Sequence, residues 1–230
     1  MIDFFEQSIF FGVIISLAAY GIGAFIRKKA KVAIANPLLI SVLLIVGFLW
    51  VFHIDFEVYK KGADYISFFL TPATVSLAIP LYRKLSLLKK YPKSILGGIL
   101  AGVFTAIGSI LAMSFLFGLT HEQYVTLLPK SITTAIAMGV SEKLGGMVSV
   151  TVVAISITGI MGNIVAESVL KLFRITDPIA KGLAIGTASH AMGTSKAMEI
   201  GEVEGAMSSL SIVIAGILTV ITASVFAKFY

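Results

Sequence analysis

The segment Gly182–Glu204 reads GLAIGTASHAMGTSKAMEIGEVE, and it lies between two long apolar runs, Met147–Leu170 and Ala206–Ala227. It is apolar enough to enter a bilayer, yet it contains many glycine, serine and threonine residues together with one histidine and one lysine. A lipid-facing helix would not carry this mixture, because polar groups in hydrocarbon cost free energy unless other polar groups satisfy them. The sequence therefore predicts a broken segment that is buried in protein or lines a water-filled cavity.

The composition indicates a membrane protein. Of the 230 residues, 57% are apolar and 13% are charged, whereas a soluble domain has about twice that share of charge. The apolar residues occur in runs of about 20, the length that an α-helix needs to cross a bilayer. We therefore predict an all-α polytopic membrane protein, a single transmembrane domain over residues 1–230, with about six full transmembrane helices. The predicted spans are Phe10–Ile26, Val32–Phe52, Ile66–Leu81, Ile95–Phe117, Met147–Leu170 and Ala206–Ala227.

The sequence lacks the motifs that mark several classes of function. The chain has no cysteine and only three scattered histidines, so we expect neither a metal site nor a cofactor. It has no nucleophile elbow, no P-loop and no zinc-protease motif, and we predict that it is not an enzyme and has no catalytic residues. The net charge of +6 comes from short basic clusters between apolar runs, which favours contact with anionic lipid over nucleic acid.

The orientation follows from the tendency of basic loops to remain in the cytoplasm. Two loops are rich in lysine and arginine, whereas the N-terminus carries Asp3 and Glu6. We therefore predict a multi-pass membrane protein with its N-terminus outside. The basic residues of the two loops are Arg27, Lys28, Lys29 and Lys31 in the first and Arg83, Lys84, Lys89, Lys90 and Lys93 in the second.

A second polar segment, Val125–Val140, decides the rest of the topology. If it crossed the bilayer fully, Lys171, Arg174 and Lys181 would lie outside, against the positive-inside tendency. If it dips in and returns, all three lie in the cytoplasm. The charge pattern favours a re-entrant segment, and a broken crossing helix is the alternative.

An internal repeat links these two polar segments. Ile132–Val150 aligns without gaps to Met192–Leu210 at an offset of 60 residues, and two methionine pairs and the pair Glu142/Glu202 are among seven identities. Chance similarity between membrane sequences of low complexity is the alternative to a duplication. If the first copy is re-entrant, the helix after it brings the second copy in from the opposite side. Two such inverted repeats of broken helices are typical of secondary transporters.

The residues of both segments suggest an anion site. Hydroxyl groups and free amides at helix N-termini can hold an anion, His190 can exchange a proton, and a lysine can supply a positive charge. The alternatives are helix packing for the small residues, a hydrogen bond from His190 to a carbonyl, and a Lys196 side chain that reaches the membrane surface. The candidate substrate-binding residues are Lys130, Ser131, Thr133, Thr134, Ser189, His190, Gly193, Thr194, Ser195 and Lys196.

Four further residues are candidates for a supporting role. Thr71 and Thr74 flank a proline that interrupts the third span, Asn163 shares a helix face with Glu167, and Glu202 has a match in the other repeat. Glu167 can equally reach water or pair with Lys171. With Glu199 and Glu204, Glu202 is also expected to form a solvated turn.

At these residues the chain resembles the LrgB/CidB family of membrane proteins. The resemblance covers essentially the whole chain, and the most specific stretch is Ala188–Ala197, which reads ASHAMGTSKA. The other stretches that carry it are NPLLIS at Asn36–Ser41, LTPATVSLA at Leu70–Ala78, PKSITT at Pro129–Thr134 and EIGEVEGA at Glu199–Ala206.

The resemblance implies one of two functions. Members are known as antiholin-like or holin-like modulators of murein hydrolase activity and lysis, usually with a small LrgA/CidA-type membrane partner. Related plant plastid proteins move glycolate and glycerate, and bacterial relatives are linked to pyruvate uptake. Together with the repeat, it favours a secondary transporter of small monocarboxylates, with proton coupling and a homo-oligomeric state expected. Residues 1–117 would then be a scaffold, and 125–230 the transport part. The alternative is a regulator of murein hydrolases and cell lysis that acts through its partner.

Overall fold

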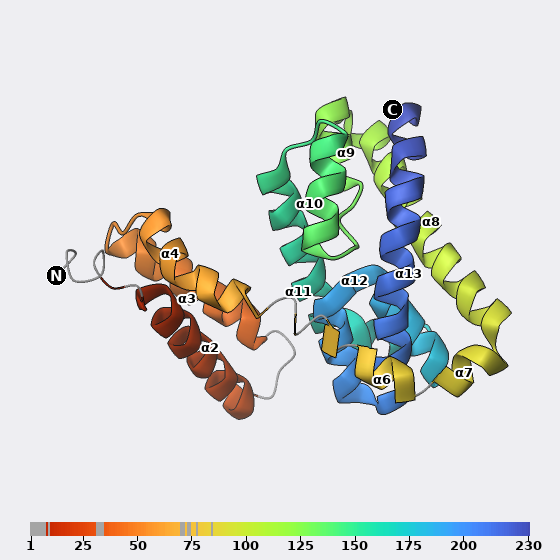
Figure 1. Ribbon diagram of the computed structural model, residues 1–230, viewed down its shortest axis with the longest axis horizontal. Helices are drawn as coiled ribbons and strands as arrows, with labels where there is room; N and C mark the ends of the chain where they lie inside the picture. Colours follow the sequence, from red (N-terminus) through yellow and green to blue (C-terminus); the bar gives the residue numbers. More distant parts are fainter. Residues whose placement is uncertain are drawn as a thin grey trace. The chain divides into compact units, whose positions relative to one another are not determined.

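A computed structural model describes residues 8, 10–30, 35–69, 72, 75–76, 78–83 and 85–230. Every regular element in these ranges is helical (Figure 1). The chain forms two compact units, Met1–Ser76 and Leu77–Tyr230. The all-α fold class is therefore confirmed.

The first unit contains three helices, α2 (Phe11–Ala30), α3 (Pro37–Val51) and α4 (Phe56–Ser67). Gly12 lets α2 touch α4 directly, since a Cβ atom there would lie 2.1 Å from the carbonyl oxygen of Tyr59. The start of α4 corrects the sequence prediction, which placed a loop before a span from Ile66 to Leu81. The predicted loop is helical instead: α4 begins at Phe56, where Asp55 caps it by accepting the Glu57 amide at 3.0 Å, and it ends at Ser67. Part of the predicted third span lies outside the described residues.

The second unit contains the remaining helices. Its long helices are α8 (Pro92–Phe117), α11 (Val148–Leu172), α12 (Pro178–Ile200) and α13 (Glu202–Phe226). Its short elements are α6 (Ala78–Arg83), α7 (Leu85–Lys90), α9 (His121–Leu127), α10 (Thr134–Lys143) and a 3₁₀ turn at Ala227–Phe229. An apolar core joins α8, α9 and α13, with Ile99, Tyr124 and Met207 fully buried in it.

Four helices in the described part of the chain are long and apolar enough to cross a bilayer, namely α2, α8, α11 and α13. They correspond to four of the six predicted spans. Helix α3 is apolar but shorter, at 15 residues. These helices confirm a multi-pass membrane architecture.

Residues 121–143 fold back on themselves, and we call them hairpin 1. Helix α9 ends at Leu127 and α10 begins at Thr134, because Pro129 has no amide hydrogen with which to continue the helix. The two ends of hairpin 1 meet at Thr151 of α11, whose hydroxyl oxygen lies 2.9 Å from the Thr126 carbonyl oxygen and 2.7 Å from the Ser141 hydroxyl oxygen. The segment therefore returns to the side from which it came, as the basic loops predicted.

Residues 178–200, which form α12, make a second hairpin, and we call it hairpin 2. The backbone reverses at Ser189 (φ −133°, ψ 15°) and His190 (φ 43°, ψ −138°). Ile185 before the bend and Ala197 after it pack in one apolar cluster, although they would be about 18 Å apart in a straight helix. The polar segment that contains His190 is thus also re-entrant.

The hairpins enter from opposite ends of this unit. The first half of hairpin 2 runs beside α8 in the same direction, with Leu183 against Gly98 and Thr187 against Gly102. The basic loops before α8 and before α12 therefore lie at one end, which we call the basic end. The chain terminus lies at the other end, where the Tyr230 hydroxyl donates to the Ser114 carbonyl oxygen at 3.1 Å. Hairpin 1 enters from that end (Figure 1), and the inverted arrangement predicted from the repeat is confirmed.

The predicted division at residue 117 stays a prediction. In the structure, α8 packs with α12 and α13 inside the second unit. The unit that holds both hairpins therefore includes α8.

Candidate functional site

The tip of hairpin 1 and the end of the first half of hairpin 2 line one cavity. It has a volume of about 600 Å³ and extends from Ser94 and Asp177 at the basic end to Lys130 and Ser131 at the tip of hairpin 1. Thr187, directly before the bend of hairpin 2, lies on its wall. The structure thus brings together polar residues from the two segments that were predicted to be broken.

Helix α8 packs against the first half of hairpin 2 and forms the adjoining wall of the cavity with small residues. A Cβ atom at Gly102 would lie 2.5 Å from the Thr187 hydroxyl oxygen, and one at Gly98 would lie 3.1 Å from a methyl carbon of Leu183. Thr105 and Ser109 add hydroxyl groups further along the same helix. Residues from α8 were absent from the predicted site, although small residues four apart at positions 98 and 102 are a recognisable signal of close helix packing.

Lys130 is the cation of this cavity. Its side chain is half-buried, and its ammonium nitrogen lies 3.4 Å from the Ser131 hydroxyl oxygen. Within the described ranges, no carboxylate lies within ion-pair distance of it. A partly buried charge without a counter-ion is costly, and an anion that entered the cavity would reduce that cost.

His190 occupies the tip of hairpin 2 but turns its ring toward α11. Its Nε2 lies 3.1 Å from the Ile155 carbonyl oxygen, and because a carbonyl only accepts, Nε2 carries the proton. Gly159 makes room for the ring, since a Cβ atom there would lie 2.7 Å from Cε1. At φ 43° His190 also holds a conformation that L-residues rarely adopt. In this conformation the ring anchors the tip to α11.

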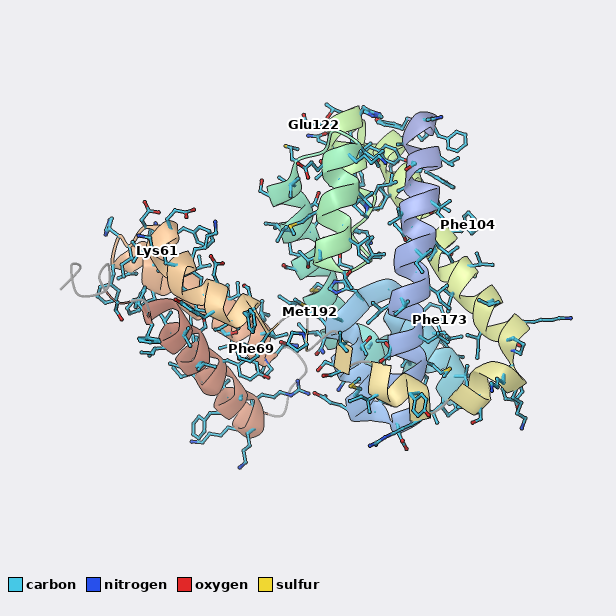
Figure 2. All side chains as sticks on the ribbon, in the orientation of Figure 1. Lys61, Phe69, Phe104, Glu122, Phe173 and Met192 are labelled. Carbon is cyan, nitrogen blue, oxygen red and sulfur yellow. The ribbon has the colours of Figure 1, made fainter. Side chains whose placement is uncertain are left out.

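Neighbouring residues fix the same bend. Ser189 fits over Gly162, where a Cβ atom would lie 1.7 Å from the serine hydroxyl oxygen. Asn163 donates to the Met192 carbonyl oxygen at 2.9 Å, and Met192 is labelled just after the bend in Figure 2. Of the predicted supporting residues, Asn163 thus holds hairpin 2 from outside the cavity.

The structure distributes the other predicted residues widely. Thr194 of hairpin 2 is buried, and its hydroxyl oxygen lies 2.7 Å from the Ser208 hydroxyl oxygen of α13. Thr133 and Thr134 start α10, Gly193 is packed against Ile185, and Ser195 is exposed. Glu202 is exposed at the start of α13, and Thr71 and Thr74 lie outside the described residues.

Lys196 lies in an ion-pair cluster. Its ammonium nitrogen is 2.6 Å from a Glu167 carboxylate oxygen and 3.3 Å from one of Glu199, and its side chain is only 14% exposed. Glu167 also pairs with Lys171 at 3.7 Å. Lys196 therefore ties the second half of hairpin 2 to α11, and the cation at the tips is Lys130.

Glu204 corrects the expectation of a solvated acidic turn. It is buried, with 7% of the residue exposed, and its carboxylate lies 4.0 Å from the Lys181 ammonium nitrogen. It also lies in the first turn of α13, where the helix dipole favours a negative charge. The sequence did not reveal this burial because Gly182, far from it in the chain, allows α12 to cover it.

Glu204→Ala is therefore expected to lower the free energy of unfolding by about 1–3 kcal/mol, because Lys181 would lose its partner in a partly buried place. Thermal unfolding of the purified protein measures this change. Glu142→Ala is the control, since that carboxylate is exposed, and should change stability by less than about 0.5 kcal/mol. Equal melting temperatures for Glu204→Ala and the wild type would contradict the assignment.

The fold and site define a polytopic α-helical membrane protein with two re-entrant hairpins that enter from opposite ends and border one cavity. The LrgB-like family model matches residues 16–229. The chain belongs to the LrgB-like family, as its motifs predicted.

Named relatives match almost the whole chain. Proteins named "Antiholin-like protein LrgB" from Bacillus mycoides (strain KBAB4), Bacillus cereus (strain B4264) and Bacillus anthracis (strain CDC 684 / NRRL 3495) are each 39% identical over 221 residues. The match covers 96% of this chain and 96% of each relative. No solved structure matches the chain significantly.

Proposed function

We propose that this chain is a secondary transporter that carries small monocarboxylates, such as pyruvate, glycolate or glycerate, across the bacterial cell membrane together with protons. One observation carries the proposal: Lys130 lies at the inner end of a cavity between two re-entrant hairpins, with no carboxylate of the described residues beside it. A site at the junction of inverted, broken segments is the usual arrangement in secondary transporters.

The chemistry of the cavity fits a small monoanion. One ammonium group matches one carboxylate, and charge-assisted hydrogen bonds are among the stronger ones available. Hydroxyl groups of Ser131, Thr105 and Ser109 surround the cavity and can pair with the hydroxyl or keto oxygen of a two- or three-carbon acid. The volume of about 600 Å³ leaves space for water beside such a substrate.

The position of the cavity suggests how access would alternate. It reaches the basic end along α8 and the first half of hairpin 2, so the site is accessible from that end, which we assign to the cytoplasm. At the same end, the ion pair between Lys196 and Glu167 fastens hairpin 2 to α11. Movement of one hairpin relative to the other would open the opposite end.

A second candidate function is regulation of murein hydrolases and lysis with an LrgA/CidA-type partner. The comparisons support it more directly than they support transport, because the relatives are named antiholin-like. The geometry favours transport, since a chain that acted only through a partner would have no use for a cation facing an internal cavity. Transport requires the positive charge of Lys130 to bind the substrate, whereas regulation through a partner does not.

Uptake of labelled pyruvate and glycolate into proteoliposomes tests the proposal. We expect saturable uptake that an inward proton gradient stimulates, and liposomes without protein are the control. If neither the chain alone nor its complex with an LrgA-type partner shows saturable uptake, while the chain still modifies lysis in cells, the regulatory function is correct.

A substitution can separate proton transfer by His190 from its hydrogen bond to the Ile155 carbonyl oxygen. In His190→Gln the amide can still donate to the Ile155 carbonyl oxygen, but it cannot exchange a proton. If His190 carries the coupled proton, accumulation driven by a pH gradient, worth up to about tenfold per pH unit for one proton, should be lost. Substrate exchange without a gradient should remain. Wild-type accumulation by His190→Gln would show that the ring serves only to anchor the tip.

A further inference from the structure

A second cavity lies at the basic end, where α11 ends and hairpin 2 begins and ends. It has a volume of about 710 Å³ and is separate from the cavity at the hairpin tips. Its lining includes Lys171 and Arg174 from the end of α11 and Lys181 from the start of α12. These are the residues that the charge pattern places in the cytoplasm.

The charge of this second cavity is unbalanced. Its one carboxylate, Glu167, is engaged by Lys196 at 2.6 Å and by Lys171 at 3.7 Å. Lys181 is 4.0 Å from Glu204, at the limit of an ion pair. Arg174 has no carboxylate within ion-pair distance in the described ranges. The cavity therefore presents excess positive charge, concentrated at Arg174.

Arg174 also occupies a backbone position that favours glycine. The amide of Ile175 donates to the Leu170 carbonyl oxygen at 2.9 Å, and that of Arg174 donates to the Lys171 carbonyl oxygen at 3.1 Å. This pair of bonds is the Schellman motif that ends a helix, and Arg174, at φ 54°, stands where glycine is commonest. An arginine at this backbone position costs stability relative to glycine. Its presence is therefore better explained by a role for the guanidinium group than by the backbone conformation.

Apart from Thr176, the remaining lining residues are apolar, and the cavity borders the lipid-facing side of α11. Leu170, Ile175 and Ile200 line it, and the adjacent Leu172 and Phe173 are exposed by 75% and 69%. Phe173 is labelled in Figure 2. Since α11 is long enough to cross the bilayer, this end of the helix lies at the membrane surface. A ligand here would meet cations and apolar side chains together.

We propose that this second cavity binds the headgroup of an anionic phospholipid of the cytoplasmic leaflet. The phosphodiester would pair with the Arg174 guanidinium, whose planar donors suit phosphate oxygens, and with the Lys171 and Lys181 ammonium groups. The glycerol and the first acyl carbons would cover the apolar residues. A soluble anion would leave that apolar surface in water, so the observations favour the lipid. The proposal does not depend on carboxylate transport.

Native mass spectrometry of the detergent-solubilised full chain, titrated with phosphatidylglycerol or phosphatidylcholine, tests this site. The wild type is expected to bind phosphatidylglycerol preferentially. Arg174→Gly and Lys171→Gln are each expected to weaken that binding about fivefold, the effect of one basic residue near an anionic headgroup. Lys89→Gln is the matched control, because it removes an exposed charge of the same kind outside the cavity and should leave the occupancy of the tightest site unchanged.

Arg174→Gly separates lipid binding from folding. Glycine suits the backbone at this position, so the variant should melt at the same temperature as the wild type or higher, measured without lipid, while it loses phosphatidylglycerol. Wild-type lipid binding by Arg174→Gly would overturn the proposal, as would an equal loss in Lys89→Gln. Displacement of the lipid by millimolar inorganic phosphate would also overturn it, in favour of a soluble anion.

Discussion

Lys130→Ala is expected to reduce saturable monocarboxylate uptake by a factor of about one hundred or more. Removal of one partner from a buried charge pair costs about 3–5 kcal/mol, and each 1.4 kcal/mol is a factor of ten in affinity. In this site Lys130 is the cation nearest to both hairpin tips, and Ser131 alone offers only a neutral hydroxyl group. Initial rates of labelled pyruvate uptake into proteoliposomes measure the loss.

Two variants make this result specific. Lys143→Ala removes an exposed lysine from the same hairpin and should transport like the wild type. Lys130→Arg retains the charge and should recover part of the uptake, although its larger group will not pair with Ser131 in the same geometry. If Lys130→Ala transports at the wild-type rate, the cavity between the tips is not the substrate site. If it abolishes lysis control but the wild type shows no uptake, Lys130 serves the regulatory function instead.

Much of this architecture is predictable because its signals are local. Pro129 breaks hairpin 1, and the glycine-rich, polar sequence around His190 predicts the bend of hairpin 2. The internal repeat at an offset of 60 residues links the two broken segments and so predicts the inverted arrangement of the hairpins. The position of a chain reversal can be inferred from the sequence when a proline or a glycine-rich stretch marks it. The residues at that reversal can then be named as candidates for the site.

The burial of individual side chains cannot be predicted from the sequence immediately around them. Lys130 and Lys196 both lie next to a serine in a predicted broken segment, yet one lines the cavity and the other pairs with Glu167 of α11. Glu204 is likewise buried only because hairpin 2 covers it. Burial of this kind depends on which helices are neighbours, and a pattern along one helix does not specify its neighbours.

Gly186→Leu is expected to abolish the folded state of hairpin 2. A Cβ atom at Gly186 would lie 2.5 Å from the Ser208 carbonyl oxygen and 2.8 Å from the Ser208 Cα atom. Those atoms belong to the backbone of α13 and cannot rotate away, so hairpin 2 would have to separate from α13. Overpacking costs about 1–3 kcal/mol even where side chains can adjust, and the cost here should exceed that range. Size-exclusion chromatography and thermal unfolding should show aggregation or a large loss of stability.

Gly97→Leu is the matched control for this substitution. Gly97 also lies in a long helix, but a Cβ atom there meets no other atom within 4 Å, and leucine is the better helix former by about 0.5–1 kcal/mol. The control should therefore fold and transport normally. A Gly186→Leu protein that remains monodisperse with an unchanged melting temperature would show that hairpin 2 can leave α13 at little cost. Hairpin 2 would then be the element that moves during transport, because its close backbone contact with α13 at Gly186 is what opposes that movement.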